Sequence, residues 1–360
     1  MIVENGTRRL SAAMSKKMSH LMFIMSVLVV YIHFADFSYA ALPGYGWESL
    51  IERAFFACFG RVAVPLFFCL SGYLTFSKIQ VNSKSLVLAY KTKVKTLLVP
   101  YLLWNIFYTL VFVCTKLMNH TLHEVDNWGI LLLESVFLHG QNGALWYILS
   151  LMVLTLAAPA LFVVYKNKPL SVAFALIACI AFFFVEDTPA WLPLTGLAYY
   201  SIGATAAMHF QKNVDGSFWS AKTKKIVSVI SLVVFVSLCV LRLTAFDKGQ
   251  SDHEIRRMPL CRMIEAGLAF SFWFAADLVD FGKIKVRSFE QNSFLIYVAH
   301  NFGIVVVHLL LDLVPLDMTP VTRLAVYLLG PIVIVAAIST VSGILKKVMP
   351  RFHALISGGR

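Results

Sequence analysis

The sequence predicts an all-α, polytopic integral membrane protein with about ten transmembrane helices. Of its 360 residues, 59% are hydrophobic and only 14% are charged. Apolar runs recur along the whole chain, and roughly 20 residues of helix cross about 30 Å of hydrocarbon. Inside lipid such runs must be helical, because no water is present to satisfy an open backbone.

Ten apolar runs are long enough to be spans, and we expect them to form one membrane domain over residues 19–346, between tails at 1–18 and 347–360. The first run continues too far for a cleavable signal peptide, so it stays as a span. The run from Trp128 to His139 is too short and carries Glu134, which favours an interfacial or re-entrant helix. The predicted spans cover residues 19–39, 55–77, 96–117, 144–165, 169–185, 190–210, 225–243, 263–281, 290–311 and 323–346.

The positive charge of the chain predicts its orientation. The net charge is +12, and most of the 31 lysines and arginines fall in alternate short loops and in the two tails. This is the pattern of cytoplasmic loops, so both termini are expected in the cytoplasm. No basic run is interleaved with stacking aromatics, which argues against a nucleic-acid partner.

The first two spans carry ionisable residues inside apolar sequence. LMFIMSVLVVYIHF is apolar except for His33, and GRVAVPLFFCLSGYLTF opens with Arg61. Such residues are costly in lipid, so a functional interpretation is the default. From the helical rise, His33 lies about 18 Å from the cytoplasmic face, Arg61 about 9 Å from the outer face, and His300 about 15 Å from the inner face. We therefore expect these three side chains to meet between the midplane and the outer face.

The span that contains His300 presents further polar groups. Ser293, Tyr297 and His300 follow the spacing i, i+4, i+7 and share one helical face. Asn301 falls on the same side. The sequence therefore predicts that this face lines the site.

A carboxylate lies close to His33 in the sequence. Asp36 is three residues further along, so it can orient or charge the imidazole at the outer mouth of the site. A histidine with a pKa near 6.5 can act as a general base near neutral pH. No metal-binding spacing such as HExxH occurs, and the histidines in loops or at span ends, including His353, are expected to be solvated.

Each of these residues also has a structural explanation. A lone intramembrane His33 equally often caps a carbonyl of a neighbouring helix, and Arg61 can reach the outer headgroups. Tyr297 and Trp146 also fit ordinary interfacial aromatics. The Ser71–Gly72 step also fits a packing notch between helices.

Five segments, in this order and spacing, resemble the acyltransferase 3 family, multipass inner-membrane acyltransferases that modify cell-envelope glycans. Each segment alone is a weak pattern, and the set covers most of the chain. The segments are VLVVYIH ending at His33, GRVAVPLFFCLSGYL from Gly60, KTLLVPYLLWN from Lys95, LWYILSLMVLTLAAP from Leu145 and NSFLIYVAH ending at His300.

The resemblance implies an O-acyltransferase in the inner (plasma) membrane. An acyl group, often acetyl, would pass from cytoplasmic acyl-CoA, such as acetyl-CoA, to a hydroxyl of a surface polysaccharide or lipid-linked glycan. No metal is implied, and membrane lipids surround the protein. The alternatives are a transporter of such glycans, although no inverted repeat is evident, and a catalytically idle family member that acts as a scaffold.

The resemblance also implies roles for individual residues. His33 would deprotonate the acceptor or relay the acyl group, Arg61 would stabilise oxyanion charge, and His300 would orient the acceptor. Lys91, Lys93 and Lys95 would attract the phosphates of CoA, although positive-inside anchoring explains them equally well. The candidate substrate-binding residues are Asp36, Ser71, Tyr73, Trp146, Tyr297 and Asn301.

One position departs from the family pattern. Family members commonly carry an arginine eleven residues before the histidine of the first span, and here that residue is Met22. Lys16, Lys17 and His20 are nearby but out of register with it. If the family arginine contacts the acyl donor, this chain must use a different contact or bind the donor more weakly.

Overall fold

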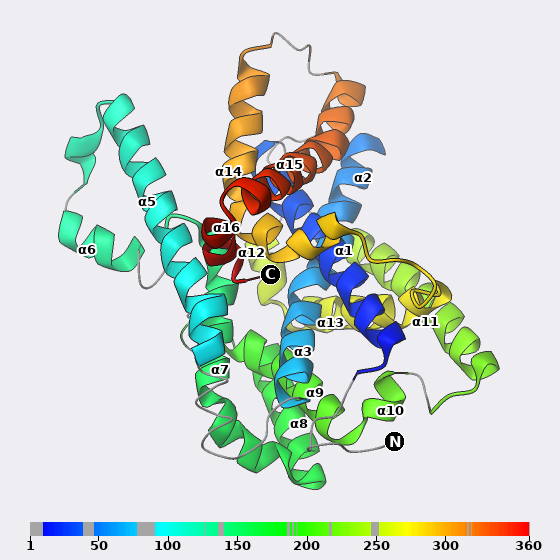
Figure 1. Cartoon of the computed structure of the whole chain (residues 1–360). Helices are drawn as coiled ribbons and strands as arrows, with labels where there is room; N and C mark the ends of the chain where they lie inside the picture. Colours follow the sequence, from blue (N-terminus) through cyan, green and yellow to red (C-terminus); the bar gives the residue numbers. More distant parts are fainter. Residues whose placement is uncertain are drawn as a thin grey trace.

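The computed structural model describes residues 10–38, 47–77, 91–125, 127–135, 140–185, 188, 191, 193–215, 218–245, 252–314, 317 and 319–359. Within these residues the protein is all-helical, without strands, as the sequence predicts. α1 and α3 lie centrally, between α5 and α6 on one side and α11 on the other (Figure 1).

Each of the ten predicted spans coincides with a helix. Seven helical segments of the described chain are long and apolar enough to cross a membrane, whereas α8, α9 and α13 have 17, 16 and 17 residues. The number of spans and the position of the termini therefore stay predictions. The helices are α1 (Ala12–Ser38), α2 (Trp47–Ala54), α3 (Ala63–Phe76), α5 (Val99–Met118), α6 (Trp128–Leu133), α7 (Trp146–Tyr165), α8 (Lys168–Phe184), α9 (Leu194–His209), α10 (Gln211–Val214), α11 (Ala221–Ala245), α12 (Asp252–Arg257), α13 (Pro259–Ala275), α14 (Ser293–Asp312), α15 (Pro320–Val348) and α16 (Pro350–Ser357).

The peripheral helices expose apolar side chains. On α11, Ile230, Val233 and Val240 are 57%, 60% and 57% exposed. In water, such a continuous apolar face would be an aggregation liability. Facing lipid, it needs no cover, which fits a membrane protein.

α3 and α9 pack backbone against backbone. A Cβ added at Gly72 would collide with the carbonyl oxygen of Tyr200, and one added at Gly203 would collide with the carbonyl oxygen of Cys69. Small residues allow this close approach of membrane helices. The packing explanation of the Ser71–Gly72 step therefore holds for its glycine.

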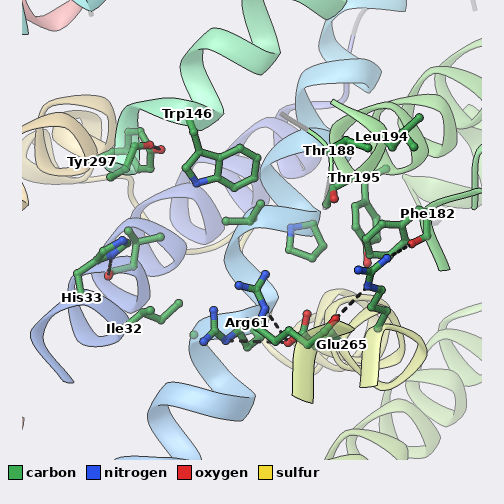
Figure 2. A pocket seen from close by; sticks show the side chains of 18 of the residues that line it. Ile32, His33, Arg61, Trp146, Phe182, Thr188, Leu194, Thr195, Glu265 and Tyr297 are labelled. Atoms are coloured by element: carbon green, nitrogen blue, oxygen red, sulfur yellow. Dashed lines mark hydrogen bonds and ion pairs between the residues drawn. The ribbon is translucent and has the colours of Figure 1, made fainter. Parts of the chain in front are cut away.

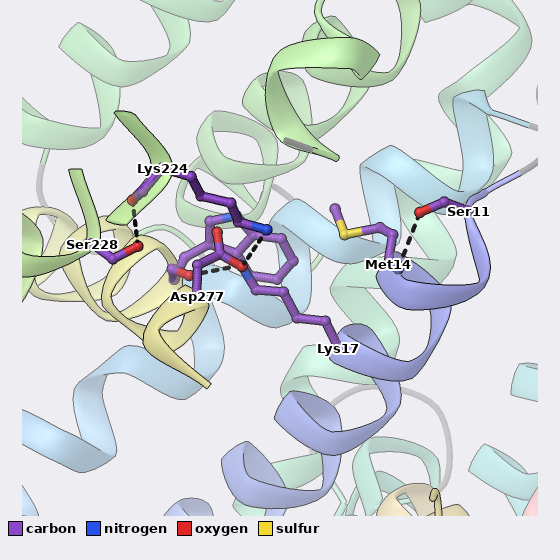
Figure 3. Close-up of polar contacts among 7 residues, drawn as sticks. Ser11, Met14, Lys17, Lys224, Ser228 and Asp277 are labelled. Atoms are coloured by element: carbon purple, nitrogen blue, oxygen red, sulfur yellow. Dashed lines mark hydrogen bonds and ion pairs between the residues drawn. The ribbon is translucent and has the colours of Figure 1, made fainter. Parts of the chain in front are cut away.

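The first turns of α1 are tied to the helices beside them. Ser11 caps α1 by accepting a hydrogen bond from Met14 N at 3.2 Å. Lys17 Nζ lies 2.8 Å from Asp277 Oδ1 and donates to the Trp273 carbonyl at 2.9 Å. Lys224 of α11 approaches the same Asp277 oxygen at 3.6 Å (Figure 3). One carboxylate thus holds a lysine from each of two helices.

A break in helix geometry precedes α3. A π-helical turn over Phe55–Phe59 and a 3-10 turn over Gly60–Val62 connect α2 to α3. Such turns within longer helices often mark functional sites. A side chain at Gly60 would clash with Ile32, so the glycine lets this turn lie against α1. The contact brings Arg61 next to the turn of α1 that carries His33.

Two further expectations concern the chain ends and the short apolar run. α6 covers only part of Trp128–His139, and residues 136–139 lie outside the described residues, so its interfacial placement stays a prediction.

His353 is buried, whereas the sequence led us to expect a solvated side chain. It is 4% exposed, and its Nε2 lies 2.9 Å from the Ser342 hydroxyl. Because α16 packs inward, burial lowers the pKa of His353 below its usual value.

Candidate active site

A cavity of about 390 Å³ contains four of the residues selected from the sequence. His33, Arg61, Trp146 and Tyr297 all line it. They come from α1, the 3-10 turn before α3, α7 and α14, so four separate segments converge there. Figure 2 shows His33 and Tyr297 at one end, with Arg61 and Trp146 further along. We call this space the His33 cavity.

His33 and His300 are neighbours, as their predicted depths suggested. Their ring centroids are 4.8 Å apart, with the planes tilted by 58°. His33 is half-buried and lines the cavity, whereas His300 is fully buried and is not among the lining residues. His300 therefore supports His33 from behind instead of facing the cavity.

Hydrogen bonds define the tautomer of both imidazoles. His33 Nδ1 lies 2.9 Å from the Val29 carbonyl, and His300 Nδ1 lies 2.6 Å from the Tyr297 carbonyl. A carbonyl only accepts, so in each ring Nδ1 must carry the hydrogen. In the neutral ring, Nε2 then holds a lone pair. His33 is thus arranged to accept a proton at Nε2.

α14 is held next to His300 by a buried hydroxyl. Tyr108 donates to the Val298 carbonyl at 3.0 Å and accepts from Phe302 N at 3.2 Å. Val298 O and Phe302 N are i and i+4 partners of an α-helix. The hydroxyl therefore bridges one hydrogen-bonding step of the helix around His300 and ties α5 to it.

Tyr297 separates two cavities. It lines the His33 cavity and also a second space of about 130 Å³. Its hydroxyl donates to the Ala144 carbonyl, in the short turn before α7. Its ring contacts that of Tyr147, with centroids 5.5 Å apart. A single aromatic side chain, fixed at its hydroxyl, thus contributes to the walls of both spaces.

The second space, which we call the Lys93 cavity, is lined by other residues of α1, α3, α7 and α14 and by the segment before α5. Lys93 and Met22 line it, and Met22 is the position where the family pattern has arginine. Ser71 also lines it and lies 3.1 Å from the hydroxyl of Tyr147. The remaining lining residues are Ser26, Phe67, Leu70, Leu74, Leu97, Tyr147, Ile148, Leu151, Ser293, Phe294 and Tyr297.

Other predicted site residues lie apart from the His33 cavity. Tyr73 is buried and lines neither of these two cavities. Asn301 donates to the Asn142 side chain and is likewise absent from both linings. Lys91 and Lys95 are exposed. The side chain of Asp36 lies outside the described residues.

The His33 cavity contains charged residues that the sequence did not lead us to select. Arg256, Arg262 and Glu265 line it together with Arg61. Glu265 lies within a predicted span, and the rule that singled out His33 applies to it equally. A search for ionisable residues inside every span would have found it.

The polar groups do not form a metal site within the described part of the chain. No group of three or more histidine, cysteine, aspartate or glutamate side chains is close enough there to hold an ion. Among the described lining residues of the His33 cavity, the charged or basic side chains are those of His33, Arg61, Arg256, Arg262 and Glu265.

Comparison with known protein families identifies a match. A sequence model of the acyltransferase domain family called acyltransferase 3 matches residues 20–340. No curated protein and no solved structure matches the chain. The matched range contains His33, Arg61 and His300, and it covers most of the chain. This protein therefore belongs to the acyltransferase 3 family.

Proposed function

We propose that this acyltransferase takes an acyl group, such as acetyl, from cytoplasmic acyl-CoA and transfers it to a hydroxyl of a cell-surface or lipid-linked glycan. The observation that carries the proposal is the pair of cavities on either side of Tyr297. A donor and an acceptor that approach from opposite faces of a membrane need two such spaces. They also need a reactive group where the spaces approach each other, and His33 lies there.

The Lys93 cavity is the proposed donor side. It is the smaller of the two cavities and mainly apolar, which suits the chain that carries the thioester of acyl-CoA. Lys93 precedes the π-helical turn Val94–Leu98 at the beginning of the α5 segment. An ammonium group there acts as a point charge for a phosphate. The positive-inside rule places the same lysine in the cytoplasm.

The His33 cavity is the proposed acceptor side. Nε2 of His33 takes the proton from the acceptor hydroxyl, and the resulting oxygen attacks the thioester carbonyl. The C–S bond then breaks, the new C–O bond forms the ester, and the thiolate of CoA takes up the proton. Arg61 is the group in the cavity best suited to stabilise the oxyanion that forms at the carbonyl.

The test is mass spectrometry of envelope glycans from cells with and without the protein. We expect an acyl mass to be missing in the deletion strain and in a His33→Ala strain. Removal of a general base typically costs about 10²–10⁴-fold in rate. His120→Asn is the matched control, because His120 is exposed and its positive φ of 56° is tolerated by asparagine.

Normal acylation in a His33→Ala strain with wild-type protein levels would refute the mechanism. Unchanged acylation in the deletion strain, with an altered amount or location of the glycan, would instead indicate transport.

A further inference from the structure

The His33 cavity has uncharged polar groups on the wall that α7 and α9 form. Trp146, the first residue of α7, lines the cavity and is 37% exposed. Thr195, in the first turn of α9, lines the same cavity and is half-buried. Figure 2 shows Trp146 between Tyr297 and Thr195. The indole and the threonine therefore face the space that His33 also lines.

The protein itself engages neither of these polar groups. Within the described part of the chain, no hydrogen bond involves the indole Nε1 of Trp146 or the hydroxyl of Thr195. A threonine in a helix often donates to the carbonyl of the preceding turn, as Thr109 does to Asn105 at 2.8 Å. Thr195 makes no such bond. Both groups can therefore bond to a ligand in the cavity.

A third hydroxyl lies deeper in the same wall. Tyr199 follows Thr195 by one turn of α9, lines the cavity and is 2% exposed. Its hydroxyl has no hydrogen-bond partner among the described residues, and Glu265 and Arg256 act on it only through their charges. Buried hydroxyls are mostly bonded in proteins. One without a partner beside a cavity is consistent with a wall that receives a polar ligand.

Packing fixes the two accessible groups relative to each other. The ring of Phe68, on α3, contacts that of Trp146, with centroids 6.0 Å apart. The same ring lies so close to Gly196, the neighbour of Thr195, that an added Cβ would approach it to 2.8 Å. One aromatic side chain thus holds the beginnings of α7 and α9 together. Groups fixed in this way on packed helices suit a specific ligand site.

These features suit a sugar. A sugar unit combines an apolar face of C–H groups with hydroxyls that both donate and accept hydrogen bonds. An indole offers an apolar face and one donor, and a threonine hydroxyl both donates and accepts. A volume of about 390 Å³ also lies within the range of small-molecule sites. Hydroxyl recognition does not depend on the net charge of the cavity, beside which Glu186 and Asp187 lie outside the described residues.

We propose that Trp146 and Thr195 bind a sugar unit of the acceptor, with the sugar ring packed on the indole and one sugar hydroxyl hydrogen-bonded to Thr195. Another hydroxyl of the glycan is then presented to His33. This inference rests on the proposed function, because it assumes that the acceptor occupies this cavity. It adds the residues that select the acceptor. A glycan that lacks the bonded hydroxyl leaves Thr195 unpaired and should bind more weakly.

The test is direct binding to the purified full-length protein in detergent, which requires no acyl transfer. The probes are two glycan fractions of the deletion strain, the water-soluble envelope polysaccharide and the lipid-extracted glycan. Each is titrated by microscale thermophoresis. We expect at least one fraction to bind, and the one that binds more tightly identifies the source of the acceptor.

Thr195→Val is the test variant, because valine has nearly the shape of threonine and lacks its hydroxyl. Loss of one uncharged hydrogen bond should weaken binding by about two- to tenfold, whereas Thr195→Ser keeps the hydroxyl and should retain the binding. Trp146→Ala should weaken binding by about tenfold, since it removes both the packing face and the donor. Thr244→Val is the matched control, because Thr244 is exposed on α11 and lines neither cavity.

Absence of binding by both fractions, equal binding by Thr195→Val and Thr195→Ser, or unaltered binding in Trp146→Ala would overturn the sugar site. None of these results would affect acyl transfer that depends on His33. Conversely, binding that depends on Thr195 and Trp146, in a protein without acylation activity, would sustain this site and refute the proposed function.

Discussion

His300 lies directly behind His33, with their ring centroids 4.8 Å apart, and it is fully buried where His33 is accessible. Replacement of His300 by glutamine should therefore disturb the orientation of His33 without removing a substrate contact. We expect kcat to fall by roughly 10–100-fold, as for a small misplacement of a reacting group, with both KM values unchanged.

The control for this prediction is His308→Gln on the same helix. His308 stacks on Phe34, with ring centroids 5.3 Å apart, and does not line the His33 cavity. The measurement is steady-state acyl transfer in membrane vesicles. A rise in acceptor KM for His300→Gln, with kcat unchanged, would instead place His300 in the acceptor site.

Tyr297 should keep the thioester away from water. Tyr297→Ala joins the two cavities, and an open site permits hydrolysis of a reactive group. We expect this variant to release free CoA from acyl-CoA in the absence of acceptor, as measured with a thiol reagent. Tyr297→Phe keeps the ring and loses only the bond to Ala144 O, so it should show no such release. Equal release by both variants would contradict this role of the ring.

Lys93 should contribute to donor binding. Removal of one ammonium near a phosphate costs about 1 kcal/mol at a partly exposed site, which weakens binding by about fivefold. We expect this loss in Lys93→Ala, measured by equilibrium dialysis with radiolabelled acetyl-CoA. The exposed Lys91 supplies the control variant Lys91→Ala.

A second variant tests the same cavity from its other wall. Met22 lines the space that Lys93 lines and occupies the position of the family arginine. Met22→Arg in the Lys93→Ala background should restore acetyl-CoA binding to near the wild-type level. Failure of this rescue, with normal folding, would show that the two positions do not serve one ligand.

The lysine pair on Asp277 should matter for stability. In Asp277→Asn, Lys17 loses its 2.8 Å ion pair while staying 5% exposed. Breaking a buried pair leaves an uncompensated charge and costs about 3 kcal/mol. We expect Tm in detergent to fall by several degrees. Asp280→Asn, whose partner Lys283 is exposed, should leave Tm unchanged; an equal fall in both variants would contradict the prediction.

The long apolar helices were predictable from the sequence because each is an apolar run of sufficient length, whereas short helices such as α12 and α16 were not predicted. Helix ends were less predictable: the span expected at 263–281 is a helix that begins at Pro259 and ends at Ala275. Charged residues occupy its first turns, where an apolar-run criterion excludes them. Arg262 therefore fell just outside the predicted span, whereas Glu265 fell inside it, and both residues line the cavity.

The sequence predicted how deep each site residue lies along its own helix, but not which side of the helix faces which cavity. Depth estimates placed His33 near His300, since both lie on uninterrupted apolar runs. Depth estimates could not show that Ser71 and His33 line different cavities, which share only Tyr297 among their described lining residues. Rotation of each helix about its axis is set by contacts such as Gly60 on Ile32. Such contacts join residues far apart in the chain, and no local pattern encodes them.

The glycines that join α3 and α9 also limit which parts of the protein are able to move. Gly72 and Gly203 each admit the backbone of the opposite helix, so neither helix can slide or rotate without driving a side chain into that backbone. Ser71 lies on α3, and Arg61 lies in the 3-10 turn immediately before α3. We therefore expect α3 and α9 to stay fixed relative to each other, and any motion that opens a route past Tyr297 to come from α1, α7 or α14, which also line the two cavities.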